Sequence, residues 1–317
     1  MKLISEAIST PQKNSLYVKT ENHNTIKSIV KSKMFFPVFL SGLSGNGKTL
    51  SVQQVCAELD RKLVRVNITS ETDEDDLIGG FRLVNGETVW FDGPVVKAMK
   101  EGAILLLDEV DLGTNKILCL QGVLEGNGIF IKKIGETVLP AEGFNVIATA
   151  NTKGQGDDTG RYSGTNFLNE AFLERFPVWL DQEYPTTKLE KKILENAVKV
   201  FGIADIERYG NVIEALVAWS DQIRKAYIEE AYTELITTRR LVHIIQALQI
   251  TKDPVAAINL CLSKFSKETQ ESFLIVFDQF YLPFEESSDE NVLGEFENAM
   301  QLKKDTDTGD IEKWITD

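Results

Sequence analysis

Apolar residues in the first half of the chain gather into short continuous runs, whereas in the second half they recur every three or four positions. Runs at residues 38–40, 103–107 and 144–150 are bounded by polar turns, as in strands that are buried on both faces of a parallel sheet. From about residue 187 the spacing is that of amphipathic helices. The pattern predicts an α/β fold, with a parallel sheet flanked by helices and a smaller all-helical domain after it.

Weaker signals divide these regions further. The alternating residues 63–68 predict another strand, and two hairpins are predicted around Asn85-Gly86 and around residues 133–136. Helices are predicted at residues 50–59, 94–100, 115–125, 167–176, 188–201, 205–231, 238–250, 254–263 and 267–280. We therefore expect a lead-in and core domain at 1–186, a helical domain at 187–283 and an acidic, flexible tail at 284–317.

A glycine-rich stretch joins the first predicted strand to the next helix. Gly42, Gly47, Lys48 and Thr49 fit the phosphate-loop pattern G-x-x-x-x-G-K-[ST], in the strand-loop-helix context that this pattern requires. Glycines let backbone N–H groups face phosphate oxygens, the lysine adds a positive charge, and the hydroxyl is a ligand for Mg²⁺. We predict that a nucleoside triphosphate binds to Gly42, Ser44, Gly45, Asn46, Gly47, Lys48, Thr49 and Leu50.

Polar residues follow two of the predicted buried strands. Asp108 and Glu109 end the run at 103–107, where ligands of parallel sheets bind, so Asp108 is expected to hold Mg²⁺ and Glu109 to activate the attacking water. Asn151 follows the run at 144–150 and is expected to hold the water or the γ-phosphate. A strand-ending asparagine that only begins a turn is the alternative for Asn151.

Two arginines are further candidates for contact with phosphate. Arg175 precedes Phe176-Pro177, but its spacing from the phosphate loop does not assign it to the same site. Arg239 and Arg240 open a predicted helix, where a positive charge opposes the helix dipole and therefore requires an anionic partner. Bound nucleotide and a neighbouring carboxylate both satisfy that requirement.

Composition limits the other classes of function. The formal net charge of −14 argues against a broad nucleic-acid surface, although a basic pore inside an acidic exterior would still be compatible with it. The three cysteines lie far apart among apolar neighbours and are expected to be buried, reduced thiols, and His243 is expected to pack on an apolar helix face. With no leader or membrane span predicted, we expect a cytoplasmic protein that does not bind membranes.

With these motifs placed, residues 25–250 resemble AAA+ ATPases of the MoxR type, most closely the ATPase subunit of aerobic cobaltochelatase and its phage-encoded relatives. The resemblance is most specific in Ala148-Thr149-Ala150-Asn151 and in the Gly-Asp-x-Thr-Gly-x-Tyr-x-Gly-Thr arrangement within residues 154–165. Residues 77–99 also resemble the helix-2 insertion of that family. The tail at 284–317 matches no part of the chelatase subunit.

The resemblance implies roles for the matching residues. It implies ATP and Mg²⁺ as cofactors, Walker A at 42–49, Walker B at 105–109, Asn151 as sensor 1 and Arg239 as sensor 2. Arg175 corresponds to the arginine finger that enters the neighbouring subunit's site, with Arg161 as the next candidate. The family's usual assembly is a homo-oligomeric ring, generally a hexamer, and the chelatase role requires a protein partner, usually one with a von Willebrand factor A domain.

Three functions are compatible with these features. The favoured one is an ATP-driven motor that remodels a partner protein or complex. A nucleic-acid motor of the helicase type is the second, because Lys132 and Lys133 in the second predicted hairpin could touch phosphates in a pore. A nucleotide-dependent binding module without turnover is the third, and the presence of Glu109 argues against it.

Overall fold

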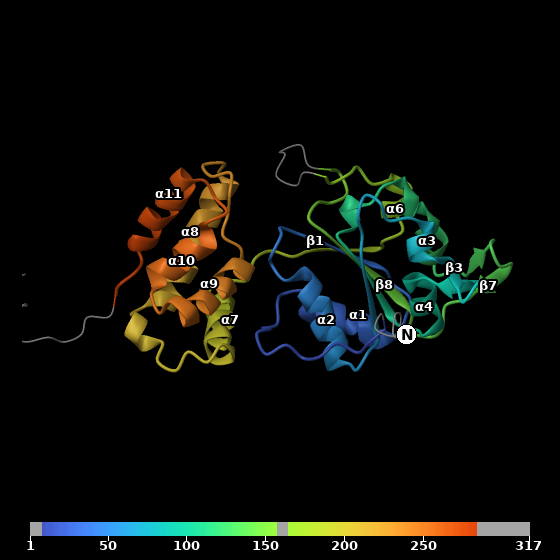
Figure 1. Cartoon of the computed structure of the whole chain (residues 1–317), viewed down its shortest axis with the longest axis horizontal. Helices are drawn as coiled ribbons and strands as arrows, with labels where there is room; N and C mark the ends of the chain where they lie inside the picture. The colour runs from blue at the N-terminus through green and yellow to red at the C-terminus, as the bar shows by residue number, and fades with distance from the viewer. Residues whose placement is uncertain (1–7, 157–163, 284–317) are drawn as a thin grey trace, which may run out of the picture.

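The computed structural model describes residues 8–156 and 164–283. Figure 1 shows two parts, an α/β domain drawn in blue to yellow-green and a helical domain drawn in yellow to orange. The acidic stretch at 284–317 and the segment 157–163, which includes Arg161, lie outside the described residues.

The α/β domain is built on a five-stranded sheet in the order β2-β5-β8-β1-β9. Its strands, all parallel to their neighbours, are β1 (Val38–Ser41), β2 (Leu63–Asn67), β5 (Ile104–Asp108), β8 (Asn145–Ala150) and β9 (Val178–Asp181). Because parallel strands end at the same edge of a sheet, the polar residues that follow β1, β5 and β8 are brought together. The predicted α/β fold with a parallel sheet is confirmed.

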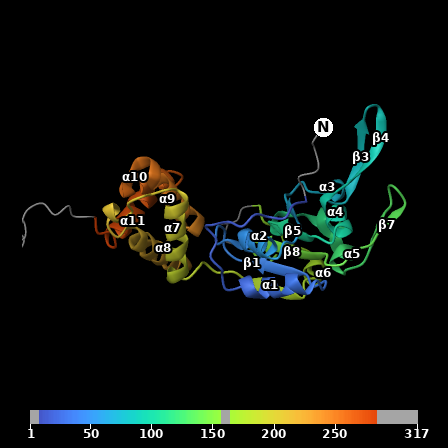
Figure 2. The same cartoon turned by 90° about the horizontal axis from the view of Figure 1, so that it is seen from below.

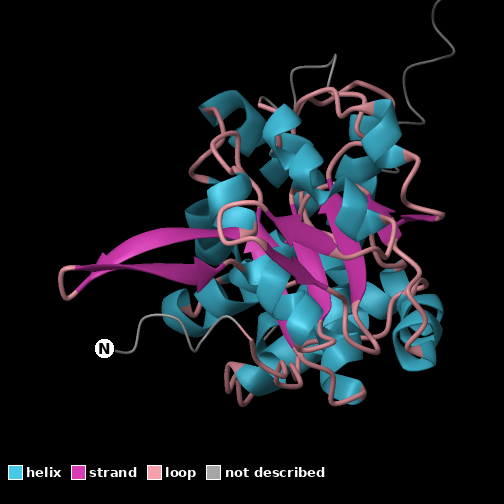
Figure 3. Cartoon of the chain, turned by 90° about the vertical axis from the view of Figure 1, so that its right-hand side faces the viewer, coloured by secondary structure: helices cyan, strands magenta, loops and turns pink. Residues whose placement is uncertain are grey.

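Every residue of β1, β5 and β8 is buried, because helices cover both faces of the sheet (Figure 3). On one face, α1 (His23–Ser32) and α2 (Lys48–Glu58) pack on residues such as Leu40 and Leu106. On the other, α4 (Pro94–Lys100) packs on Leu105 and Leu107, close to α3 (Glu74–Leu77) and α6 (Glu170–Leu173). An apolar core therefore lies on each face of the sheet, and the two cores together fix the positions of the strand ends.

Two hairpins extend from the α/β domain, as the sequence predicts (Figure 2). The first pairs β3 (Gly79–Val84) with β4 (Glu87–Asp92), and the second pairs β6 (Ile129–Ile131) with β7 (Glu136–Val138). Asn85 and Gly86, at the tip of the first hairpin, both have positive φ angles, of 53° and 86°. A two-residue turn of type I′ requires this conformation, and asparagine followed by glycine adopts it at low cost.

The helical domain contains α7 (Thr187–Val200), α8 (Val212–Ile228), α9 (Thr238–Thr251), α10 (Pro254–Leu262) and α11 (Lys267–Asp278). Its core centres on Trp219, Phe273 and Phe277, whose rings meet edge to face. The Trp219 indole N–H donates to the carbonyl oxygen of Phe273 at 2.7 Å, which satisfies the polar atom of this buried ring.

Several predicted helices differ from the observed ones. The helix predicted at 205–231 is divided at Gly210, whose φ of 61° ends a short 3₁₀ helix, η3 (Glu207–Tyr209), before α8 begins. The region 115–125 forms the 3₁₀ helix η2 (Asn115–Leu120) followed by one turn, α5 (Gln121–Leu124), and the region 167–176 is helical only in α6. A further 3₁₀ turn, η1 (Val110–Leu112), follows β5. Helix α1 and strand β9 were not predicted.

Two expectations about single residues need correction. Cys56 is buried, but Cys119 and Cys261 are only half-buried, although all three are free thiols. His243 is largely exposed on α9 rather than buried on an apolar face. Within residues 8–156 and 164–283, no helix combines the length and apolar character needed to cross a membrane.

Replacing Leu106 with alanine should lower the free energy of unfolding of the α/β domain by about 2–5 kcal/mol, since its side chain is fully buried and would leave a cavity. Denaturant unfolding followed by fluorescence measures this loss. Leu83→Ala is the matched control, because Leu83 is 76% exposed on the first hairpin, and its cost should stay below about 0.5 kcal/mol. Equal losses for the two variants would contradict the assignment of Leu106 to the core.

Candidate nucleotide-binding site

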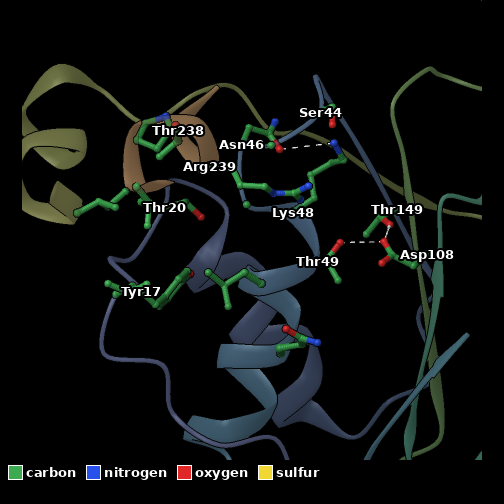
Figure 4. A pocket seen from close by; sticks show the side chains of 18 of the residues that line it. Tyr17, Thr20, Ser44, Asn46, Lys48, Thr49, Asp108, Thr149, Thr238 and Arg239 are labelled. Carbon is green, nitrogen blue, oxygen red and sulfur yellow. Dashed lines mark hydrogen bonds between the residues drawn. The ribbon is translucent and has the colours of Figure 1, made fainter. Parts of the chain in front are cut away.

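A cavity of about 430 Å³ lies at the carboxyl edge of the sheet, between the α/β domain and helix α9. Figure 4 shows Thr49, Asp108 and Thr149 on one side of it, and Thr238 and Arg239 of the helical domain on the other. Every residue predicted to bind nucleotide or metal lines this cavity except Gly42, and so do Glu109, Asn151 and Arg239. The lead-in contributes Leu16, Tyr17, Val18 and Thr20 to the lining of the cavity.

Gly42, Gly45 and Gly47 of the loop between β1 and α2 all have positive φ angles, and at the first two a side chain would also meet a neighbouring segment. Gly42 has a φ of 145°, and a Cβ atom there would collide with the carbonyl oxygen of Gln182. Gly45 has a φ of 74°, and its Cβ atom would lie 2.8 Å from Cβ of Thr237 in the helical domain. Glycine therefore lets the loop curl and lets both neighbouring segments approach its backbone closely.

Lys48 lies at the start of α2 and is only 8% exposed. Its ammonium group donates to the carbonyl oxygens of Gly42 and Leu43, at 2.6 and 2.9 Å, and to Oδ1 of Asn151 at 3.3 Å. Among the described residues no carboxylate forms an ion pair with it, and burial lowers its pKa to about 8. A phosphate group in the cavity would supply the missing negative charge, and the amino end of α2 favours the same anion.

Two oxygen atoms suited to a magnesium ion lie side by side in the cavity. The Thr49 hydroxyl donates to Oδ1 of Asp108 at 2.8 Å, and the Thr149 hydroxyl donates to the same oxygen. Hydroxyl and carboxylate oxygens are the ligands that Mg²⁺ prefers, so these side chains fit the ion that the phosphate-loop pattern implies. The other oxygen, Oδ2, accepts from Nε of Arg65 at 2.9 Å.

Glu109 lines the cavity with an unusual backbone conformation. It follows β5 with a φ of 58° and a ψ of 44°, in the left-handed region that glutamate rarely adopts. Its N–H group donates to the Thr149 hydroxyl at 3.3 Å, which helps to hold the strained residue in place. Strain of this kind concentrates at functional sites, where it directs a side chain toward a ligand.

Asn151 is held by a residue that the sequence analysis did not single out. Asp111 is completely buried, and its Oδ2 accepts from the backbone N–H groups of Asn151 and Thr152, both at 2.9 Å. The amide oxygen of Asn151 is thereby fixed beside Lys48. Arg65 and Asp111 were missed because their positions depend on strand pairing and loop contact, although the third acidic residue in Asp108-Glu109-Val110-Asp111 was a visible signal.

The structure distinguishes Arg239 from Arg240. Arg239 faces the cavity, and its backbone N–H donates to the carbonyl oxygen of Gly45 at 3.3 Å. Its guanidinium group has no hydrogen-bond or ion-pair partner in residues 8–156 and 164–283. Arg240 turns away, donates to the carbonyl oxygen of Cys261 and lies over the ring of Phe265. A carboxylate partner for Arg239 is therefore not found in the described part of the chain.

Arg175 does not reach the cavity of its own chain. Its Nε donates to Oε1 of Glu125 at 2.9 Å, and its Nη1 donates to the carbonyl oxygen of Ala171. His243, by contrast, lines the cavity, and burial together with the nearby Arg240 and Arg239 lowers its pKa. This position differs from the packing on an apolar helix face that the sequence predicts for His243.

Comparison with known proteins places the chain in a family. Residues 37–176 match the model of the AAA domain, dynein-related subfamily. An uncharacterized protein of Staphylococcus aureus is 32% identical over 195 residues, which cover 59% of this chain and 68% of that protein. The chain belongs to the AAA+ ATPase family.

Two named relatives extend the comparison. This AAA+ ATPase is 31% identical over 211 residues to the aerobic cobaltochelatase subunit CobS of a Sinorhizobium species, which covers 65% of this chain and 63% of CobS. It is 32% identical over 164 residues to midasin of Giardia intestinalis, which covers 50% of this chain and 3% of midasin. The chain thus spans less than two thirds of either relative, and the similarity to the cobaltochelatase subunit is confirmed.

Solved structures support the fold. A point mutant of RuvB from Thermotoga maritima superposes with a TM-score of 0.52 at 16% identity, covering 93% of this chain and 80% of RuvB. At this identity the likeness concerns the fold alone.

The pKa of Lys48 makes nucleotide affinity depend on pH. In this AAA+ ATPase the amine is charged below pH 8 when no nucleotide is bound, and it loses its proton above that value, well below the 10.5 of a free lysine. Affinity for ADP, measured by calorimetry in EDTA, should therefore fall between pH 8 and 9.5 by up to about tenfold per unit, because the bound state needs the proton. A guanidinium stays charged throughout, so Lys48→Arg should bind with an affinity independent of pH. A flat profile for the parent protein would contradict the account.

Proposed function

We propose that the chain is a Mg²⁺-dependent ATP hydrolase that assembles into a ring and remodels a partner protein or complex in the cytoplasm. The observation that carries the proposal is the convergence of Lys48, Thr49, Asp108, Glu109 and Asn151 in one cavity, with Arg239 entering it from the helical domain.

Each side chain has a role that follows from its position. Lys48 and the backbone of the loop bind the phosphates, and Thr49 with Asp108 would hold Mg²⁺, which supplies charge neutralisation at the β- and γ-phosphates. Glu109 accepts a proton from the attacking water, and Asn151 orients that water or the γ-phosphate. Arg239 contacts the γ-phosphate from the helical domain, so that the presence of ATP is sensed by both domains.

Assembly into a ring would explain the position of Arg175. This residue lies outside its own cavity, paired with Glu125, although its motif corresponds to an arginine finger. In a ring it would enter the site of the neighbouring subunit and stabilise the charge of the transition state there. We propose a homo-oligomeric ring, with the hexamer as the assembly that the family resemblance favours.

A protein is the favoured substrate of the proposed motor. Lys133, one of the two lysines that could touch nucleic acid in a pore, forms an ion pair with Asp75, and the net charge of the chain is −14. The relative CobS is named as a subunit of an aerobic cobaltochelatase. We therefore propose a protein partner for this chain as well, with a von Willebrand factor A domain as the expected type.

Glu109→Gln should keep the affinity for ATP and lower the turnover number at least about a hundredfold, because the amide cannot accept a proton. Phosphate release measures turnover, and a fluorescent ATP analogue measures binding. Glu87→Gln, an exposed position on the first hairpin, is the matched control and should leave both unchanged. Turnover within twofold of the parent protein would refute the role of Glu109.

Arg175→Ala should bind ATP normally but hydrolyse it at least about a thousandfold more slowly, the usual contribution of an arginine finger. If the finger acts on the neighbouring subunit, mixing Arg175→Ala with Glu109→Gln should restore activity. In such a ring, intact Arg175 side chains face sites that retain Glu109. Mixtures no more active than either variant alone would show that the finger lies elsewhere.

The substrate of the motor is identified by a pull-down from lysate of the native host, with the ATP-bound Glu109→Gln variant as the bait. A discrete protein found by mass spectrometry, absent with Lys48→Met, would support the remodelling motor. Recovery of DNA or RNA without such a protein would instead favour a nucleic-acid motor.

A further inference from the structure

The segment between β9 and α7 connects the two domains and also contacts the phosphate loop. The Gln182 N–H donates to the carbonyl oxygen of Ser41 at 2.8 Å, and the Gln182 side chain donates to the carbonyl oxygen of Asn46 at 3.2 Å. Gln182 is 3% exposed, and the Asn46 side chain donates back to its carbonyl oxygen. The start of this connecting segment is therefore fixed to both ends of the loop.

Two residues farther on, Tyr184 bridges the domains. Its hydroxyl group donates to the carbonyl oxygen of Ser44 in the phosphate loop at 2.6 Å. The guanidinium carbon of Arg224, on α8 of the helical domain, lies 4.0 Å from the centre of its ring. A cation over an aromatic face at this distance is attractive, so the half-buried side chain is held from both sides.

Arg224 belongs to a buried polar network within the helical domain. Its Nη1 and Nη2 donate to the two carboxylate oxygens of Glu190, at 2.9 and 2.8 Å, and Glu190 is 1% exposed. The Thr238 hydroxyl donates to Oε1 of Glu190 at 2.6 Å. Paired, planar contacts of this kind fix direction as well as distance, so Arg224, Glu190 and Thr238 keep one geometry.

The network leads back to the phosphate loop. Thr238 is followed by Arg239, whose N–H donates to the carbonyl oxygen of Gly45. Two consecutive residues of the loop, Ser44 and Gly45, thus accept hydrogen bonds from the two ends of one chain of interactions, Tyr184 and Arg239. A shift of the Ser44 carbonyl group would be transmitted through Tyr184 to the start of α9.

We propose that Tyr184 is a positioning residue that sets the place of Arg239 over the phosphates, acting through Arg224, Glu190 and Thr238. This inference rests on the proposed function, because it assigns Arg239 to the γ-phosphate. A purely structural role for the buried ion pair would not require the Tyr184 hydroxyl group. That group lies on the segment that connects the two domains, and it donates to the loop from a half-buried position.

The test compares affinities for ADP and for a non-hydrolysable ATP analogue. Tyr184→Phe keeps the ring under Arg224 and removes the hydroxyl group that donates to Ser44. Affinity for the analogue should fall about threefold to tenfold, the range expected for one hydrogen bond, while affinity for ADP stays within about twofold. Thr238→Val, which removes the hydrogen bond between Glu190 and the start of α9, should give the same selective loss.

A matched control separates positioning from stability. The Tyr232 hydroxyl group lies 2.7 Å from that of Ser272, and its ring packs on Phe273, away from the loop. Tyr232→Phe should leave both affinities unchanged. Melting temperatures within about 3 °C of the parent protein for all three variants would show that the helical domain is intact.

A double-variant cycle with Arg239→Ala decides whether Tyr184 acts through Arg239. Arg239→Ala should reduce affinity for the analogue but not for ADP, and adding Tyr184→Phe should cause no further loss. If Arg239→Ala is selective but Tyr184→Phe is not, or if the two losses multiply, the inference is wrong and the proposed function stands. If Arg239→Ala itself is not selective, the role of Arg239 fails, and the inference fails with it.

Discussion

The structure depends on a buried positive charge that makes no ion pair with any carboxylate of the described residues. The Lys48 ammonium group is held by carbonyl and amide oxygens, without a carboxylate in ion-pair contact among residues 8–156 and 164–283, and burial lowers its pKa to about 8. An isolated ammonium group in such a place is costly unless a counter-charge arrives. A phosphate bound in the loop would offset this cost, which explains why the loop buries the Lys48 ammonium group.

The sheet gives this charge its surroundings. Strand β1 lies between β8 and β9, so the loop that follows β1 is flanked by Asn151 after β8 and by Gln182 after β9. Asp108, the last residue of β5, is one strand farther away and accepts a hydrogen bond from the Thr49 hydroxyl. The α/β domain thus forms one side of the cavity, and Arg239 of the helical domain lines the other. Under the proposed function, the state of the nucleotide and the relative position of the domains are linked.

The buried strands, the first hairpin and the phosphate loop could all be predicted from the sequence. The strands carry continuous apolar runs, the hairpin has Asn85-Gly86 at its turn, and few other structures share the sequence pattern of the phosphate loop. Strand β9 was missed because Val178–Asp181 is only four residues long and alternates in burial at the edge of the sheet. The break before α8 was signalled by Gly210-Asn211, which the helical periodicity on both sides obscured.

The residues of the candidate site fall into the same two groups. Those that belong to a sequence motif were predicted, whereas those that only tertiary contacts bring to the site were not. Arg65 meets Asp108 because β2 pairs with β5, Asp111 holds Asn151 across a loop, and Tyr184 contacts Ser44 from the other end of the core. No spacing rule connects such residues, since the fold alone brings them together.

In the proposed ring, each site hydrolyses ATP only when a neighbouring subunit completes it. The most direct measurement is steady-state ATP turnover per subunit against protein concentration, with Mg²⁺ and with EDTA, alongside sedimentation to determine the assembly state. ATP turnover per subunit should be negligible for the monomer, rise to a plateau as rings form and vanish in EDTA. Turnover per subunit that is already maximal in the monomer would contradict this prediction.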